Sequence, residues 1–264
     1  MEHETPAAQQ SPVRLGRTLR RAVRQSWDSL GLVCAASLTL FAACVPVALF
    51  WYALSPWFIV RLVGGWVAAS LALAPLMAGV CYLVNQVLEH DEPSYLDVWR
   101  GARRMFARAV AVGSIQLAVQ GSLIAGVVFY ATRGSLVLTA LAAVCVYALV
   151  FWWAMCLYQW PLLVAAEVGL LRRDDGGTPT LRSVFRNSAL LALAAPGYAC
   201  GLLLVLAAVE IPLIASGVGA ALLGSGFLAF AATQATRDQL VRYGAIPPPP
   251  DTEGPAPDEP WRVA

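Results

Sequence analysis

Residues 135–160 read SLVLTALAAVCVYALVFWWAMCLYQW and contain no charged side chain. A bilayer core of about 30 Å is crossed by about 20 apolar residues, because an α-helix rises about 1.5 Å per residue. This stretch therefore predicts a membrane-spanning helix.

Five other stretches have the same length and apolar character. Together they predict six transmembrane helices, at residues 31–54, 58–84, 109–131, 135–160, 197–216 and 217–236. The second and fourth apolar runs continue to Leu88 and Leu171, so these helices are expected to tilt or to project into the cytoplasm. Only Ser216-Gly217 separates the last two, which predicts a tight antiparallel hairpin. The predicted fold class is an all-α, polytopic membrane helix bundle.

The composition supports this class and excludes several others. Of the 264 residues, 59% are hydrophobic and 13% charged, whereas a soluble domain has about 45–50% and about 25%. All 18 basic residues are arginine, which excludes P-loop NTPases, pyridoxal Schiff-base enzymes and Ser-x-x-Lys hydrolases. The two histidines are far apart in sequence, and the six cysteines lie in apolar runs without a Cys-x-x-Cys pair. We therefore predict no catalytic, cofactor-binding or metal site, and no enzyme.

Arginine placement predicts the orientation, because short loops rich in arginine stay in the cytoplasm. Sixteen of the 18 arginines precede the first predicted span, follow the second, fourth or sixth, and so share one side. Only Arg61 and Arg133 lie on the other side. The prediction is a multi-pass protein of the inner (plasma) membrane with both termini in the cytoplasm.

The two ends of the chain differ from its centre. Residues 1–13 are polar, and residues 244–264 are rich in proline and acidic side chains. Such segments bury too little apolar surface to fold, so both are predicted to be disordered tails that flank a membrane domain at residues 14–243.

An internal repeat runs through the membrane domain. Residues 18–26, 94–102 and 180–188 align without gaps: each has a hydroxyl residue first, apolar residues at positions two, five and six, arginine at position seven and a small residue at position nine. The spacing predicts short amphipathic helices on the cytoplasmic face, each opened by a hydroxyl cap and followed by a hairpin. The expected apolar faces are Leu19/Ala22/Val23, Tyr95/Val98/Trp99 and Leu181/Val184/Phe185, and the repeat units are residues 18–93, 94–179 and 180–243.

The repeated arginines are Arg24, Arg100 and Arg186. They could anchor the protein on anionic lipid and fix its topology. Alternatively they form a basic ring around a cytoplasmic vestibule or a docking site for a partner.

Glu210 is the one clear ionisable residue within a predicted span. Placing an unpaired charge at that depth in the bilayer costs at least about 2.5 kcal/mol, so a charged residue there needs either a compensating partner or a function. Because Arg61 and Arg133 are the bases on the same side, an ion pair with one of them is expected. Glu210 is then either a structural salt bridge or a group that carries a proton or holds a cation.

Gln116 and Gln120 lie one turn apart on the third span, Gln159 lies on the fourth and Gln234 on the sixth. Such amides either join helices through hydrogen bonds or line a path for a solute. A polar cavity that reaches Glu210, Gln116 and Gln120 would favour transport, whereas an apolar packed centre would not.

Short motifs carry a family resemblance. They are Tyr158-Gln-Trp-Pro-Leu-Leu163, then Arg186-Asn-Ser-Ala-Leu-Leu-Ala-Leu193 with Pro196, and in the midsection Tyr95-Leu-Asp-Val-Trp-Arg100 and Arg103-Arg-Met-Phe-Ala-Arg-Ala109. With these the chain resembles the YesL-like family of bacterial six-span membrane proteins of unknown function, over most of residues 15–240. It departs from the family pattern at Ala74, where a Gly-Pro step is usual, and at Met105, where Asn is typical. The resemblance implies an accessory role beside carbohydrate uptake systems and supplies no catalytic residues.

Two functions follow from the sequence. The first is a non-enzymatic accessory, scaffold or regulatory membrane component whose partners are the lipid bilayer and a transporter complex or a second copy, without nucleic acid. The alternative is a small-solute transporter or a substrate-binding membrane component.

Overall fold

The computed structural model describes residues 15–53, 58–89, 93–171, 180–217 and 219–247, and the described part is helical without strands. The predicted tail at residues 1–13 and residues 248–264 of the predicted tail at 244–264 lie outside it, whereas residues 244–247 are described and Ile246 is buried in the core. The helices are α1 (Leu15–Asp28), α2 (Leu30–Ala53), α3 (Phe58–Glu89), α4 (Leu96–Arg104), α5 (Phe106–Ala131), α6 (Leu136–Glu167), α7 (Leu181–Ala194), α8 (Pro196–Ser216), the π-helical turn η1 (Ala220–Gly224) and α9 (Ser225–Arg242).

Five helices are long and apolar enough to cross a membrane: α2, α3, α5, α6 and α8. The second and fourth predicted spans do extend as expected, since α3 continues to Glu89 and α6 to Glu167. The predicted sixth span, residues 217–236, is not among the five. The chain there is divided between η1 and α9, and α9 includes polar residues that are buried against other helices, among them Thr233, Gln234 and Gln239.

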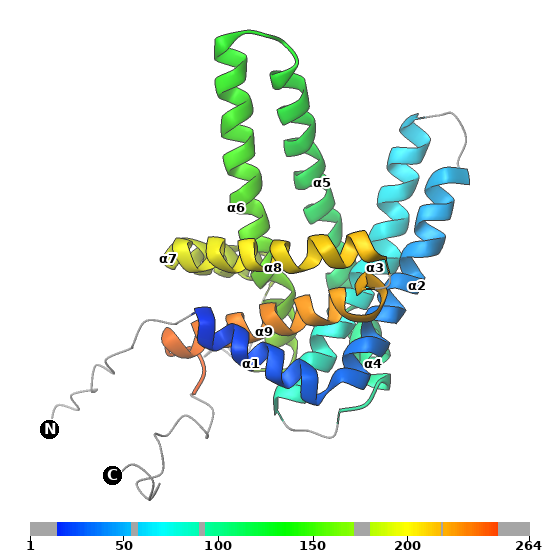
Figure 1. The fold of residues 1–264 in the computed structure, drawn as a ribbon, viewed down its shortest axis with the longest axis vertical. Coiled ribbons are helices and arrows are strands. Elements are labelled where there is room, and N and C mark those ends of the chain that lie inside the picture. The colour runs from blue at the N-terminus through cyan, green and yellow to red at the C-terminus, as the bar shows by residue number, and fades with distance from the viewer. Residues whose placement is uncertain (1–14, 54–57, 90–92, 172–179, 218, 248–264) are drawn as a thin grey trace, which may run out of the picture.

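Two upright hairpins and a transverse pair make up the bundle (Figure 1). In this view the α2/α3 and α5/α6 hairpins run upward, whereas α8 and α9 run across them. The predicted turn between α8 and the following segment is present, and Gly217 occupies it with φ +65°. Only glycine adopts that backbone conformation without steric cost, so the residue type is explained by the reversal of the chain.

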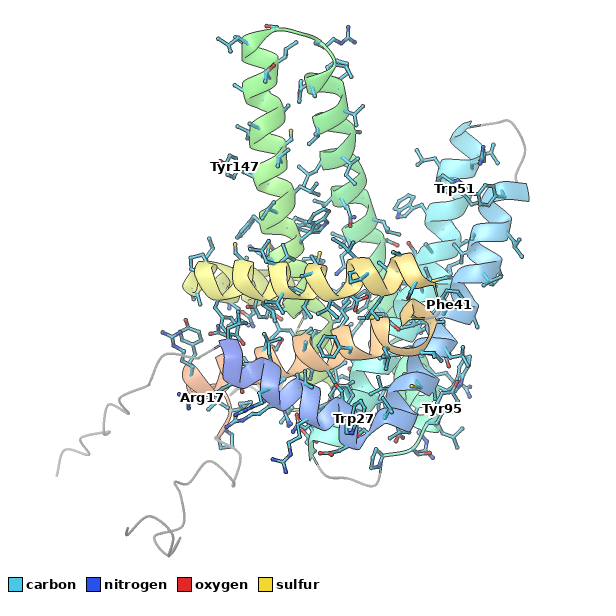
Figure 2. All side chains as sticks on the ribbon, viewed as in Figure 1. Arg17, Trp27, Phe41, Trp51, Tyr95 and Tyr147 are labelled. Carbon is cyan, nitrogen blue, oxygen red and sulfur yellow. The ribbon has the colours of Figure 1, made fainter. Side chains whose placement is uncertain are left out.

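The packed core lies where the hairpins meet α9. Each of the helices α2 to α9 contributes buried members, with Tyr158, Leu162 and Phe230 among the largest. Toward the free end of the α5/α6 hairpin the apolar side chains face outward: Leu136 is 87% exposed and Tyr147 is 79% exposed (Figure 2). Large exposed apolar surfaces of this kind are typical of contact with lipid or another protein.

Helix α4 packs very closely on α3. A Cβ atom added to Gly79 would lie 2.2 Å from the backbone oxygen of Val98, and one added to Gly101 would lie 2.6 Å from Cβ of Tyr82. The two glycines therefore allow the backbones to approach, as small residues do between membrane helices.

The three repeated segments all lie on helices, α1, α4 and α7. Positions five and nine are buried in all three segments: Ala22 and Ser26, Val98 and Ala102, Val184 and Ser188. The predicted face is wrong at position six of the first two segments, where Val23 is 52% exposed and Trp99 48%, whereas Phe185 of the third is partly buried against the core. Position two is partly buried against apolar clusters in each segment, at Leu19, Tyr95 and Leu181.

The predicted hydroxyl caps hold only in part. The Thr180 hydroxyl accepts a hydrogen bond from the Ser183 N–H at 3.4 Å, as a cap does. Thr18 lies inside α1, so it is not a cap, and its side chain is used for a contact with α9.

Candidate functional site

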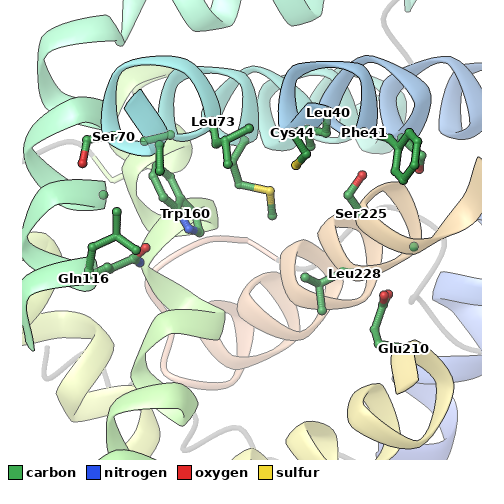
Figure 3. A pocket seen from close by; sticks show the side chains of 17 residues that line it. Leu40, Phe41, Cys44, Ser70, Leu73, Gln116, Trp160, Glu210, Ser225 and Leu228 are labelled. Atoms are coloured by element: carbon green, nitrogen blue, oxygen red, sulfur yellow. The ribbon is translucent and has the colours of Figure 1, made fainter. Parts of the chain in front are cut away.

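A pocket of about 410 Å³ opens where α2, α3, α5 and α6 meet α8, η1 and α9 (Figure 3). Its walls are mostly apolar, with Leu40, Phe41, Leu73, Trp160 and Leu228 among the lining side chains. Its polar lining residues are Ser37, Ser70, Gln116, Glu210 and Ser225. Known ligand pockets have about 300–1,000 Å³ and this same mixture of an apolar wall with a few polar groups.

Glu210 is the single charged residue of the pocket wall. It comes from α8 and packs against η1, where its Oε2 atom would lie 2.9 Å from a Cβ atom on Gly224. The glycine leaves the room that the carboxylate occupies. The Oε1 atom is buried and has no hydrogen-bond partner among the described residues.

Arg61 and Arg133 do not reach Glu210, so the expected ion pair is absent from the described part of the chain. Arg61 donates a hydrogen bond from Nε to the Trp51 carbonyl at 3.0 Å, and the Arg133 guanidinium lies 4.6 Å from the Phe129 ring centre. The physical reason is the direction of α8. Because α8 runs across the hairpins (Figure 1), the position of Glu210 along its helix does not correspond to the depth of the hairpin ends.

Gln116 forms the expected interhelical hydrogen bond, donating from Nε2 to Oε1 of Gln159 at 2.5 Å. It also lines the pocket beside Trp160, whereas Gln120 is not a lining residue. Gln234 donates to Asp238 at 3.1 Å, within α9. The pocket therefore unites Glu210 with Gln116 but does not extend to Gln120.

Three serines in the pocket were missed by the sequence analysis. Ser37 accepts a hydrogen bond from the Gly226 N–H at 2.9 Å, which ties α2 to α9. The Oγ atoms of Ser70 and Ser225 are buried and lack a partner in the described structure. A single serine in an apolar helix is weak evidence for a binding site, because the sequence does not show which other helix packs against the face that carries the serine.

Ion pairs gather at the ends of α3 and α6. Glu167 of α6 accepts from Arg104 at 2.9 Å and from Arg108 at 2.6 Å, and its side chain is only 16% exposed. Glu89 of α3 pairs with Arg237 of α9 at 2.9 Å. Burial lowers the pKa of the Arg237 guanidinium, and the neighbouring Glu89 opposes that change. These pairs join the helices at one end of the bundle.

The repeated arginines behave differently from one another. Arg100 pairs with Asp97 at 2.8 Å, one turn earlier on α4. Arg24 and Arg186 are exposed and form no ion pair with a described residue. In Figure 1, α7 lies beside α8, farther up the long axis than α1 and α4.

A small polar network joins α1, α8 and α9. The Thr18 hydroxyl donates to Oδ2 of Asp238 at 2.6 Å and accepts from the Tyr198 hydroxyl at 3.1 Å. Burial raises the pKa of the Asp238 carboxyl above its usual value, while Thr18, Arg21 and Gln234 act in the opposite direction.

No group of His, Cys, Asp and Glu side chains in the described ranges could hold a metal ion. No family model, no curated protein and no solved structure matches the chain.

Proposed function

We propose that this protein is a multi-pass membrane protein that binds a substrate and has no enzymatic activity. Its pocket binds a small and largely apolar solute. The observation that carries the proposal concerns three buried polar atoms, Glu210 Oε1, Ser70 Oγ and Ser225 Oγ. They have no hydrogen-bond partner among the described residues, and all three belong to lining residues of one pocket. Leaving a buried polar group unpaired costs about 1–3 kcal/mol. A bound solute would supply the missing partners.

The form of the pocket favours binding over conduction. Its wall is mostly apolar and holds a single charge. Gln120, which a polar path along α5 would use, does not line it. An apolar cavity with a few polar groups selects and orients a ligand.

Two cysteines provide the test, because Cys44 lines the pocket and is exposed, while Cys200 is exposed on α8 outside it. The purified protein is treated with N-ethylmaleimide, with and without 1-adamantanol, and modification of each cysteine is followed by peptide mass spectrometry. We expect the alcohol to slow modification of Cys44 severalfold and to leave Cys200 unchanged. Equal effects at both cysteines, or none at Cys44, would contradict pocket binding.

A matched pair of substitutions on α3 completes the design. Leu73 lines the pocket, whereas Leu71 is exposed and is not a lining residue. Leu73→Trp should fill the cavity and abolish the protection of Cys44, and Leu71→Trp should preserve it.

An accessory role is the second candidate, and the exposed arginines favour it. Arg24 and Arg186 present positive charge without an ion-pair partner among the described residues, so each is free to meet an anionic lipid or an acidic surface of a transporter complex. Replacing Arg24, Arg100 and Arg186 together by glutamine should release such a complex without unfolding the protein. The resemblance to the YesL-like family points to carbohydrate uptake as the setting.

The proposal includes a topology with both termini in the cytoplasm of a bacterium and a threefold repeat. The arginine distribution supports the orientation, and the contact between α1 and α9 supports a common side for the two ends of the chain. The shared burial of positions five and nine in α1, α4 and α7 supports the repeat.

A further inference from the structure

We infer that the pocket is selective for an amphiphilic amine, a solute with an apolar body and one ammonium group, and that Glu210 is the residue that holds the ammonium. This inference rests on the proposed binding function and names its substrate class.

The charge of the pocket wall is the first step. Glu210 is the one ionisable carboxylate among the lining residues, and neither lysine nor arginine lines the pocket. A carboxylate in apolar surroundings is stabilised by an opposite charge and by hydrogen bonds to its oxygens. Its Oε1 atom receives no hydrogen bond from the described residues. The wall is therefore complementary to a single positive charge that also donates hydrogen bonds.

The number of oxygen atoms decides between an organic cation and a bare metal ion. A hard cation such as Ca²⁺ takes 6–8 oxygen ligands. The pocket offers one carboxylate and a few hydroxyl and amide groups, and the described residues include no cluster that would hold a metal. An ammonium group needs only three acceptors, because it has three N–H donors.

The free hydroxyls of the wall lie apart from Glu210. Glu210 lies beside Leu228, whereas the Ser225 side chain points toward Cys44 and Phe41 (Figure 3). Ser225 Oγ, which has no hydrogen-bond partner among the described residues, is therefore a separate polar group of the wall. Ser70 lies at the other end of the pocket near Trp160 (Figure 3).

The apolar body of the solute would fill the space between these ends. Leu40, Leu73 and Leu228 line it, and about 410 Å³ accommodates a compact hydrocarbon. Burial of that hydrocarbon supplies affinity, and the carboxylate supplies selectivity for the charge.

The test compares two probes of the same shape, 1-adamantylamine and 1-adamantanol, in the Cys44 protection experiment on the full chain in phosphatidylcholine nanodiscs. Hydrogen bonds to charged groups are stronger than neutral ones, so the amine should protect Cys44 at a concentration about tenfold or more below that of the alcohol. Glu210→Gln, which keeps the shape of the side chain, should remove this preference. Glu89→Gln, which removes a carboxylate outside the pocket, should retain it.

The outcomes separate the two proposals. Equal protection by amine and alcohol in the unmodified protein, or a preference that survives Glu210→Gln, would overturn the amine inference and leave pocket binding intact. Protection by neither probe would overturn both. Cys81 is buried in the folded bundle, so its continued resistance to N-ethylmaleimide in each variant shows that the bundle is still folded.

A membrane lipid with an amine headgroup presents the same chemistry as a free amine. Nanodiscs that contain phosphatidylethanolamine distinguish these sources. Weaker protection by 1-adamantylamine in those nanodiscs than in phosphatidylcholine identifies a lipid amine as the occupant, and unchanged protection identifies a free amine.

Discussion

At the scale of single residues, the polar groups inside the bundle fall into paired and unpaired sets. Gln116 pairs with Gln159 of the next helix, and Thr18 pairs with Asp238 near the other end of the chain. Glu210 Oε1, Ser70 Oγ and Ser225 Oγ are unpaired in the described structure and belong to one pocket. The sequence identifies Glu210 as unusual but does not identify its surroundings. Periodicity predicts which face of a helix a residue lies on, but not which other helix packs against that face.

Asp238 gives a prediction about pH. Burial raises the pKa of its carboxyl above the ordinary value of 3.8, so the folded protein holds this proton more strongly than the unfolded chain does. The associated stability is fully present below 3.8 and is lost as the pH rises through the pKa of the folded state. Asp238→Asn should therefore flatten the decline of stability with rising pH.

Thermal unfolding in detergent, followed by circular dichroism between about pH 4 and about pH 7, measures this effect. The unmodified protein should lose more stability over that range than Asp238→Asn does. Parallel curves for the two proteins would contradict the assignment to Asp238.

At the scale of elements, α3 and α4 depend on glycine. The two helices approach so closely at Gly79 that an added Cβ atom would overlap the Val98 carbonyl at 2.2 Å. The sequence predicts both helices but not their contact. A glycine within an apolar run can mark a close helix contact, a bend or an exposed position, and the sequence does not distinguish these cases. The same holds for α1, α4 and α7, whose existence the repeat predicts and whose buried faces it predicts in part.

Gly79→Ala should destabilise the protein by about 1–3 kcal/mol, since backbone atoms of α4 would have to move. Gly121 of α5 provides the control, because an added Cβ atom meets nothing within 4 Å there. Gly121→Ala should be neutral or stabilising by about 0.5–1 kcal/mol, as expected for a helical glycine in open surroundings. The midpoint of chemical or thermal unfolding in one detergent compares the two. A smaller loss at Gly79 than at Gly121 would contradict the close contact.

At the scale of the whole molecule, two upright hairpins meet a transverse pair (Figure 1). This arrangement brings Glu210 of α8 to the same pocket as Gln116 of α5. It also separates Glu210 from Arg61 and Arg133, which contact Trp51 and Phe129 instead. The pocket exists because helices of different direction do not fill the space where they cross.

The proposed orientation is tested by two single substitutions at exposed positions, Ser135→Cys before α6 and Ala245→Cys after α9. In intact cells, a maleimide that does not cross membranes should label Ser135→Cys, because the arginine distribution places that loop outside. Ala245→Cys should be labelled only after the membrane is permeabilised. The reverse pattern would contradict cytoplasmic termini.

The sequence by itself determined that this is an all-helical chain with long apolar segments, because the length and hydropathy of a segment are local properties. It also identified Glu210 and Gln116 as polar residues that need an explanation inside such segments. Only the tertiary structure decided that the last apolar stretch divides into η1 and α9, that α8 crosses the hairpins, and that Glu210 faces a pocket instead of an arginine. These features depend on contacts between residues far apart in the chain, and such contacts follow from how helix faces pack together and not from the composition of any one helix.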